Sequence, residues 1–347
     1  MFSFKNRLAL ITGSSGFIGY HVTKKLLEED WKVVGIDNMS NYYDVSLKEK
    51  RLERLKLFND FEFFKGSIEK KGFVKEIVEQ FKPNLLIHLA AQAGVRYSLN
   101  EPRSYMESNI LGSFEILEAV RNNPPEHMLL ASTSSVYGAN TAMPYSEDVR
   151  ADNQLSFYAA TKKSMENIAH SYSHLYDIPT TIFRFFTVYG PWGRPDMAIF
   201  KFTDAICNDR PIEVFNYGHM KRDFTYIDDL VDALYLLTSK IPKNVSIEND
   251  IPDIGVSPAA PFRVVNIGNS SPVSLSNFIE AIEKALGKKA KKNMLPMQQG
   301  DVSATWANTE ILNRLTGYIP KTSLDVGINE FVKWYLEHFE NSFIKKA

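Results

Sequence analysis

The sequence predicts an α/β fold in which a doubly wound parallel sheet carries helices on both faces, with a smaller α+β region beside it. Apolar runs alternate with segments of helical periodicity up to about residue 187, which is typical of parallel sheets. A glycine-rich turn joins the first apolar run to the first helix. After residue 187, a turn rich in glycine and proline leads into shorter, mixed elements. We therefore expect two regions, 1–187 and 188–347.

The composition favours a globular protein that acts on a small ligand. Of 347 residues, 44% are hydrophobic and 23% are charged, and the formal net charge is −1, which argues against disorder and against a nucleic-acid partner. No apolar run reaches the eighteen or so residues of a membrane span, so we expect no membrane partner. The single cysteine, Cys207, leaves no disulfide framework or multi-cysteine metal site. We expect a cytoplasmic protein without a metal.

The first glycine turn has the context of a dinucleotide-binding loop. Gly13 permits the tight turn after residues 8–12, Gly16 lets the backbone approach a pyrophosphate, and Gly19 allows close packing of helix and strand. Phe17 and Ile18 begin the helix whose N-terminus would face the phosphates. A glycine at every third position differs from the usual G-x-G-x-x-G, and glycines alone are weak evidence. In this context they predict a Rossmann-type cofactor site.

Further candidates for cofactor binding follow the next strands. Asp37 ends the second apolar strand, near the offset expected for a carboxylate that binds an adenosine ribose. An acid there repels a 2′-phosphate, which favours NAD over NADP. Where the chain passes the adenine and the rest of the cofactor, the candidates are Ser67, Ile68, Leu89, Ala90 and Ala91.

Tyr158 and Lys162 are the strongest catalytic candidates. Their spacing of four places both side chains on one face of a helix. A nearby ammonium favours the phenolate, so the tyrosine can act as a base near neutral pH. Such a pair is common on amphipathic helices, but residues 129–138 add a buried strand that ends in hydroxyl groups. Together with the glycine turn, these features indicate a proton-transfer site.

The chain resembles the extended short-chain dehydrogenase/reductases over nearly its whole length and, among them, the UDP-glucuronate 4-epimerases. Three stretches carry this closer likeness, AQAGVRYS at 91–98, FRFFTVYGPWGRPDM at 183–197 and KRDFTYIDD at 221–229. In such enzymes a tightly held NAD oxidises the sugar at C4, and the same hydride returns to the opposite face of the 4-keto sugar. The resemblance implies a UDP-sugar substrate, NAD as cofactor and a role in polysaccharide biosynthesis.

The resemblance also implies roles for single residues. Tyr158 would remove the C4 hydroxyl proton, Lys162 would hold the nicotinamide ribose and lower the tyrosine pKa, and Thr133 would bind the reacting oxygen. Arg222 would lie on the diphosphate and Asp301 near the uridine ribose. A homodimer would form through the helix at 105–121 and the helix that carries Tyr158.

The substrate carboxylate needs its own restraint, because a 4-keto glucuronate is a β-keto acid that loses carbon dioxide easily. Hydroxyl groups can hold the carboxylate without supplying an acid. The candidates for this contact are Ser134, Ser135, Thr187, Arg194 and Arg96.

Three positions depart from relatives. Ser67 stands where many carry an aspartate, Thr187 replaces the asparagine of galactose-type epimerases, and Asn308 replaces an aspartate. The first departure predicts looser cofactor binding, and we have no interpretation of the third.

Other functions of the same fold remain as alternatives. Sugar 4,6-dehydratases carry an Asp-Glu pair after the active threonine. UDP-glucuronate decarboxylases carry a sequence similar to Thr-Ser-Glu at the same site. Ser134 and Ser135 occupy these positions here, which disfavours both reactions. A more distant alternative is a non-catalytic NAD-binding sensor, a role known for members that have lost the tyrosine or the lysine.

Overall fold

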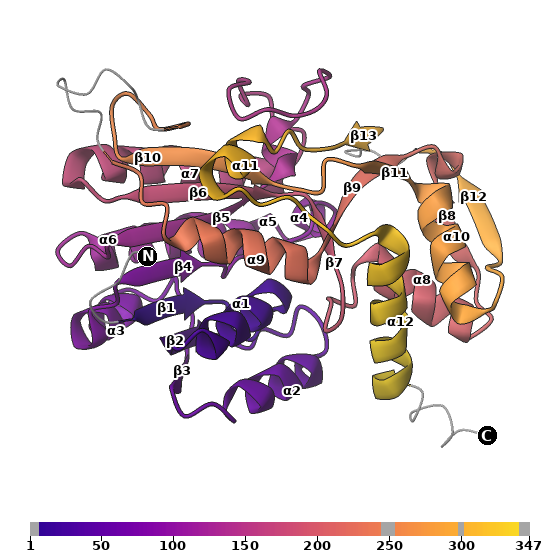
Figure 1. Cartoon of the computed structure of the whole chain (residues 1–347), viewed down its shortest axis with the longest axis horizontal. Helices are drawn as coiled ribbons and strands as arrows, with labels where there is room; N and C mark the ends of the chain where they lie inside the picture. The colour runs from indigo at the N-terminus through magenta and orange to yellow at the C-terminus, as the bar shows by residue number, and fades with distance from the viewer. Residues whose placement is uncertain (1–6, 244–253, 298–301, 340–347) are drawn as a thin grey trace.

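A computed structural model describes residues 7–243, 254–297 and 302–339. Its main feature is a seven-stranded parallel sheet with the order β10-β6-β5-β4-β1-β2-β3 (Figure 1). The strands are β1 (Leu8–Thr12), β2 (Lys32–Asp37), β3 (Phe61–Lys65), β4 (Leu85–His88), β5 (His127–Thr133), β6 (Thr180–Phe185) and β10 (Phe262–Ile267). The predicted α/β class and parallel sheet are confirmed.

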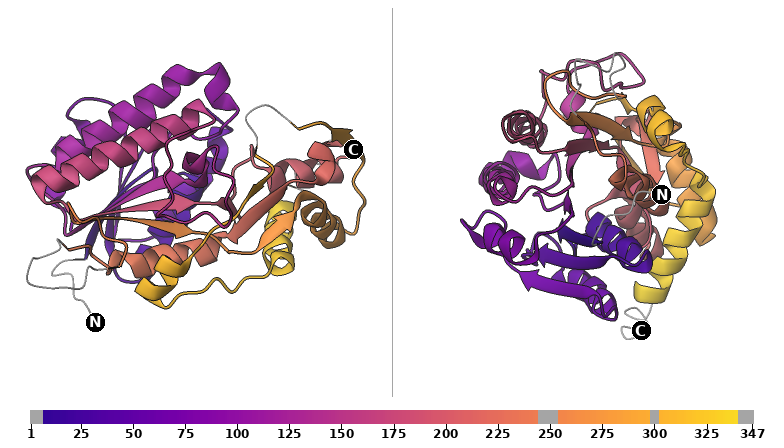
Figure 2. Two further views of the ribbon diagram at one scale, coloured as in Figure 1. Left: turned by 90° about the horizontal axis from the view of Figure 1, so that it is seen from above. Right: turned by 60° about the vertical axis from the view of Figure 1, so that its left-hand side comes forward.

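Helices cover both faces of this sheet, because alternate strand residues point to opposite sides. In β1, Ile11 packs with helices on one face and Leu10 with helices on the other, and both are buried. The first layer contains α1 (Phe17–Glu28), α2 (Val45–Leu55) and α9 (Ile227–Thr238). The second contains α3 (Phe73–Phe81), α6 (Gly112–Val120) and α7 (Phe157–Tyr176). Figure 2 shows the two layers from other directions.

A smaller region lies beyond one end of the large sheet (Figures 1 and 2). Its first sheet joins β9 (Lys221–Tyr226) with β7 (Thr187–Tyr189), β11 (Pro272–Ser274) and β13 (Ala304–Thr305), and a second pairs β8 (Ile212–Phe215) with β12 (Lys292–Leu295). Besides α9, the described helices of the later chain are α8 (Ala198–Cys207), α10 (Leu275–Leu286), α11 (Glu310–Thr316) and α12 (Leu324–Phe339).

Elements of the later chain also belong to the larger unit, and α11 packs against two of them, α9 and β10. Strand β10 belongs to the later chain, 188–347, where we expect shorter, mixed elements, but it pairs in parallel with β6 at the edge of the large sheet. Helix α9 packs against α1. The chain therefore crosses between the regions more than once, and a single boundary at residue 187 does not describe the large sheet.

The helix expected at 105–121 is not one regular α-helix. It consists of α5 (Pro102–Tyr105), a π-helical segment at Met106–Leu111 and then α6, and the short α4 (Tyr97–Asn100) precedes it. The π segment holds the buried Asn109, whose side chain donates to the Gln92 carbonyl at 3.0 Å and to Thr161 Oγ1 at 3.1 Å. These bonds connect the loop after β4 to helix α7.

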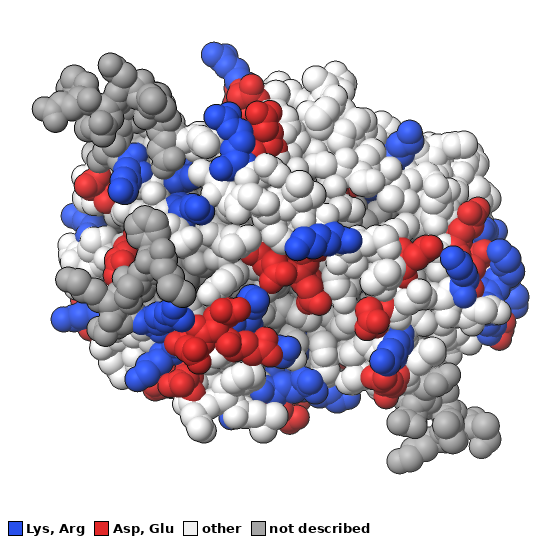
Figure 3. All heavy atoms as spheres, in the orientation of Figure 1, with Lys and Arg blue, Asp and Glu red and all other residues white. Residues whose placement is uncertain are grey.

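Basic and acidic side chains are interspersed on the surface seen in Figure 3. Several form ion pairs, including Lys24 with Glu28 at 3.1 Å and Lys25 with Asp232 at 3.4 Å. Within the three described ranges, no helix is long and apolar enough to cross a membrane.

Candidate active site

A cavity of about 1180 Å³ opens where the large sheet meets the smaller region. Strand ends β1, β2, β4, β5 and β6 contribute to it, which is the usual position of ligand sites in open parallel sheets. Its volume exceeds that of most single-ligand pockets. Of the predicted residues, it is lined by Gly13, Gly16, Phe17, Ile18, Gly19, Asp37, Ile68, Leu89, Ala90, Ala91, Arg96, Thr133, Ser134, Ser135, Tyr158, Lys162, Thr187, Arg194 and Arg222.

The glycine turn leaves no room for side chains. Gly13 has φ +74°, and a Cβ there would lie 2.8 Å from the Ala90 nitrogen. A Cβ on Gly19 would lie 1.9 Å from the Gly13 oxygen. Helix α1 follows from Gly16, and no side chain caps its N-terminus. Uncapped N–H groups and the helix dipole suit an anion, so this turn fits the pyrophosphate of a dinucleotide.

The carboxylate of Asp37 is fixed beside that turn. Its two oxygens accept from the backbone nitrogens of Ser15 at 3.0 Å and Met39 at 2.8 Å. An ionised carboxylate has about four acceptor sites, so two bonds leave capacity for ribose hydroxyls. Ser67 was also expected to contact the cofactor, but the cavity is lined by its neighbours Gly66 and Ile68 instead. The Ser67 hydroxyl accepts from Asn38 Nδ2 at 3.3 Å.

Helix α7 brings Tyr158 and Lys162 to the cavity wall. Its N-cap, Ser156, accepts from the Ala159 nitrogen at 3.1 Å. Burial raises the Tyr158 pKa, whereas a hydrogen bond with Thr133 and the charge of Arg194 act to lower it. Burial lowers the Lys162 pKa to about 8, against the opposing charge of Glu166. Lys162 Nζ donates to the Ala131 carbonyl at 2.9 Å, which fixes the ammonium at the end of β5.

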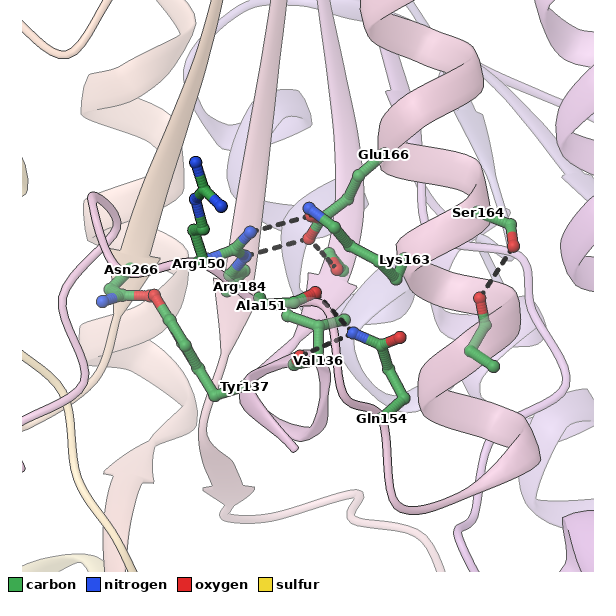
Figure 4. A network of polar contacts seen from close by, with 12 residues as sticks. Val136, Tyr137, Arg150, Ala151, Gln154, Lys163, Ser164, Glu166, Arg184 and Asn266 are labelled. Carbon is green, nitrogen blue, oxygen red and sulfur yellow. Dashed lines mark hydrogen bonds and ion pairs between the residues drawn. The ribbon is translucent and has the colours of Figure 1, made fainter. Parts of the chain in front are cut away.

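A buried charged network centres on Glu166 of α7 and Arg184 of β6 (Figure 4). Arg184 donates to both carboxylate oxygens of Glu166, at 2.9 and 2.8 Å. Ser132 Oγ donates to the same carboxylate at 2.6 Å, and Lys163 Nζ at 3.2 Å. Glu166 is one helical turn beyond Lys162, so its charge supports the buried ammonium. Its pKa is lowered because the bonds and charge of Arg184 outweigh the effect of burial.

Hydroxyl groups line the adjoining wall. The turn after β5 is a short 3-10 helix, Ser134–Tyr137, capped by Thr133. Thr133 Oγ1 accepts from the Ser135 nitrogen at 3.2 Å and donates to Ser135 Oγ at 3.3 Å. Thr187, at the start of β7, lines the same cavity. The four hydroxyl residues Thr133, Ser134, Ser135 and Thr187 therefore line the same cavity as Tyr158.

The three predicted arginines reach the cavity from separate segments. The Arg194 guanidinium binds Asp196 through two bonds, at 2.9 and 2.5 Å. The Arg96 guanidinium lies 4.7 Å from the centre of the Phe215 ring, and Arg222 Nη2 donates to the Val302 carbonyl at 2.8 Å. Asp301 lies outside the described residues. The described part of the chain has no group of three His, Cys, Asp or Glu side chains placed to hold a metal.

Comparison with known proteins identifies the family. The model of the NAD dependent epimerase/dehydratase family matches residues 9–249. The chain belongs to this family. It is 52% identical to a probable UDP-glucuronate 4-epimerase of Rhizobium meliloti (strain 1021) over 96% of this chain and 98% of that protein. UDP-glucuronate 4-epimerase 2 of Arabidopsis thaliana is 43% identical over 97% of this chain and 78% of its own length.

A solved structure gives the same result for the fold. The UDP-glucuronic acid 4-epimerase of Bacillus cereus, in complex with UDP-glucuronic acid and NAD, superimposes with a TM-score of 0.84. Its sequence is 32% identical, and the match covers 95% of this chain and 99% of that one. NAD is therefore the cofactor of this chain. The glycine turn and the Asp37 carboxylate are placed to accommodate it.

The structure also accounts for Asn308, one departure from family members. Asn308 Oδ1 accepts from the Glu310 nitrogen at 2.9 Å, and its backbone nitrogen donates to the Tyr145 carbonyl at 2.8 Å. An aspartate would accept the same bond at the start of α11. Asparagine therefore preserves this local hydrogen bond without the charge.

Sequence reasoning missed several residues at the cavity. The rings of Tyr42 and Tyr97 lie 4.8 Å apart between their centres, with their planes tilted by 52°, and the Tyr42 hydroxyl donates to Asp196 at 3.3 Å. Tyr42 lies in the turn before α2 and Tyr97 begins α4, so no local pattern indicated the contact. Glu166 had a usable signal, because it follows Lys162 at helical spacing.

Proposed function

We propose that this protein interconverts UDP-glucuronate and UDP-galacturonate through a transient 4-keto sugar, with NAD held tightly throughout. The observation that carries the proposal is the wall formed by Tyr158, Thr133 and three further hydroxyl residues, Ser134, Ser135 and Thr187. A base and hydroxyl donors meet there without a carboxylic acid after Thr133. Oxidation at C4 needs the base, and the substrate carboxylate stays intact because hydroxyl donors, not an acid, hold it.

Tyr158 acts as the base and then as the acid at the sugar C4 oxygen. When bound, NAD accepts the hydride from C4 and returns it to the opposite face. Thr133 donates to the reacting oxygen and orients it toward the phenolate. Lys162 binds the nicotinamide ribose, and its positive charge favours the ionised form of Tyr158. The proton that leaves in the first half-reaction returns from Tyr158 in the second, so no net redox change occurs.

The hydroxyl groups of Ser134, Ser135 and Thr187 bind the substrate carboxylate. They keep its bond to C5 out of alignment with the π system of the 4-keto group, because alignment leads to loss of carbon dioxide. Arg194 and Arg96 supply positive charge nearby. At the other end of the substrate, Arg222 binds the diphosphate, since a guanidinium matches two phosphate oxygens. Asp301 binds the uridine ribose.

A homodimer forms through the surface of the α5–π–α6 segment and α7. This surface exposes large apolar side chains, among them Met106 at 46%, Leu111 at 43% and Phe114 at 39%. Such a cluster is typical of a contact surface. Light scattering at micromolar concentration is expected to give the mass of two chains, and a monomer would contradict the assignment.

The protein acts in the cytoplasm and supplies activated uronic acid for polysaccharide biosynthesis. The single cysteine is consistent with a reducing compartment. Fractionation of the native host, with the protein detected by antibody, tests this location.

An NMR time course with UDP-glucuronate and UDP-glucose tests the activity. We expect conversion of UDP-glucuronate to UDP-galacturonate without added NAD, and far slower turnover of UDP-glucose. Equal rates on both sugars would refute the carboxylate assignment. Carbon dioxide and a UDP-pentose as the main products would instead identify a decarboxylase, and bound NAD without any turnover would identify a sensor.

A further inference from the structure

Arg51, on helix α2, is a fully buried cation that the proposed reaction does not use. Its side chain is 0% exposed. Nη1 donates to the Ser15 carbonyl at 3.1 Å and to the Tyr43 hydroxyl at 2.8 Å. Nη2 donates to the carbonyls of Trp192 at 2.5 Å and Gly193 at 3.3 Å. Within the described ranges, none of the acceptors of this guanidinium is a carboxylate, which is unusual because buried charges are normally paired.

The two segments that Arg51 joins belong to different parts of the cavity. Ser15 lies in the glycine turn, directly before Gly16 and the N-terminus of α1. Trp192 and Gly193 directly precede Arg194, which lines the cavity and whose charge acts on the hydroxyl of Tyr158. These segments are 177 positions apart in the sequence, counting from Ser15 to Trp192. A guanidinium spans both because its donors point in fixed directions from one plane.

Other contacts also hold the turn that carries Pro191 and Trp192 against helices α1 and α2. The His21 ring on α1 is 3.0 Å from the Pro191 carbonyl, measured from Nε2. The Tyr20 ring lies 5.8 Å from the Trp192 ring, and the Arg54 guanidinium lies 5.3 Å from the same ring. Arg51 differs from them in bonding to the backbone of both segments, so it is the group that sets their separation.

The charge of Arg51 suits a pyrophosphate at this position. Arginine remains protonated even when buried. Burial lowers the pKa of the Arg51 guanidinium, Tyr43 and the charge of Asp37 act to raise it, and the charge of Arg194 acts to lower it. The phosphates of a dinucleotide at the start of α1 would add negative charge next to the Ser15 carbonyl. The bound cofactor would thereby stabilise the guanidinium in the position that holds the Trp192–Gly193 backbone.

We propose that Arg51 is a positioning residue that couples the NAD site to the substrate site. It holds the glycine turn and the turn that carries Arg194 at one separation, so that the NAD-loaded protein presents Arg194 correctly to the uronic acid. The part that concerns Arg194 rests on the proposed function. The part that concerns NAD rests only on the family cofactor and on the geometry of the glycine turn.

The test compares Arg51→Gln and Arg51→Lys with the wild type. The first readout is the NAD content of the purified protein, from the absorbance and chromatography of the denatured supernatant. The second is the dissociation constant of UDP-glucuronate, measured by calorimetry on NAD-saturated protein. Lys50→Gln is the matched control, because it removes one positive charge from the exposed side of the same helix.

We expect Arg51→Gln to lose most of its NAD and to bind UDP-glucuronate about 10-fold more weakly, because several charge-assisted bonds are lost. Arg51→Lys keeps the charge but cannot span both segments. It should therefore retain NAD better than Arg51→Gln and still show the weaker sugar binding. Lys50→Gln should match the wild type in both readouts.

Circular dichroism and thermal unfolding of each variant separate coupling from folding. A folded Arg51→Gln with normal NAD content and normal affinity, but a lower melting temperature, would overturn the proposal by making Arg51 purely structural. If Arg51→Gln does not fold, Arg51→Lys decides alone, and wild-type values in both readouts would overturn the coupling. Neither readout requires turnover, so a wild type without epimerase activity would refute the proposed function while the coupling is still tested.

Discussion

The cofactor side and the substrate side of the cavity are built in different ways. The cofactor side uses the backbone of consecutive elements, β1, the glycine turn, α1 and β2, together with one fixed carboxylate, Asp37. The substrate side uses side chains that converge from distant segments, such as Ser135, Thr187 and Arg222. A change on the first side is therefore expected to affect mainly cofactor retention. A change on the second is expected to affect reaction outcome and selectivity.

Tyr158→Phe should have the largest effect, because Tyr158 lies where the two sides meet. We expect a loss of about 10³-fold or more in kcat, the usual range for removal of a general base. Affinity for UDP-glucuronate should stay within a few-fold, because the ring still packs near Tyr105, 6.0 Å away between ring centres. Stopped-time NMR assays and calorimetry measure the two quantities. An equal loss of binding would make Tyr158 a structural residue instead.

Gly19→Ala tests the backbone character of the cofactor side. The added Cβ would lie 1.9 Å from the Gly13 oxygen, so the turn must move. We expect most of the protein to purify without NAD and with a lowered melting temperature. Lys24→Ala, on the exposed face of the same helix, is the control and should keep its NAD. Normal NAD content in Gly19→Ala would show that the turn adapts and that its tight packing is not required.

Ser135→Ala and Thr187→Ala test the convergence on the substrate side. Each removes one hydroxyl from the proposed carboxylate site, so we expect a UDP-4-keto-pentose to leak out and the preference for UDP-glucuronate over UDP-glucose to fall about 10-fold. Such a loss matches one hydrogen bond to a charged group. NAD content should stay normal. Product analysis by NMR measures the leak, and variants that keep both fidelity and selectivity would exclude these hydroxyls from carboxylate binding.

Glu166→Gln should have the smallest effect at neutral pH and a clear one at alkaline pH. Burial lowers the pKa of Lys162 to about 8, and the Glu166 carboxylate acts against this by raising it. The reaction needs the protonated form of Lys162, so activity falls as pH rises through this pKa. Without the carboxylate the pKa of Lys162 decreases, and the alkaline limb of the kcat profile should move to lower pH. Glu118→Gln, which alters a carboxylate bonded to Tyr172, is the control and should leave the limb in place.

An unchanged alkaline limb in Glu166→Gln would show that the network in Figure 4 is structural. The glutamine side chain keeps the volume of Glu166 and one acceptor for Arg184. We therefore expect enough folded Glu166→Gln protein to measure its pH profile. A merely structural role would lower the amount of folded protein without moving the pH profile.

Local sequence patterns determined the large sheet and the position of the cofactor turn. Apolar runs and helical periodicity are local properties, so the first strand, at 8–12, and the helix that bears Tyr158 and Lys162 were predicted where the structure has β1 and α7. The strand expected within 129–138 is β5, His127–Thr133, and its predicted hydroxyl end continues as a 3-10 helix, Ser134–Tyr137. The pattern did not assign β10 to the large sheet, since a short apolar strand carries no information about its neighbour. It also did not separate the π-helical segment from the helices on either side.

The tertiary structure alone decided which distant groups meet. The sequence named Arg194 and Ser135 as candidates, but only the fold brings them to the same cavity as the glycine turn. It alone placed Arg51 between Ser15 and Trp192 and set Glu166 against Arg184. The physical reason is that buried charges take acceptors from whichever segments the packed core brings near them, and such contacts leave no periodic signal along the chain.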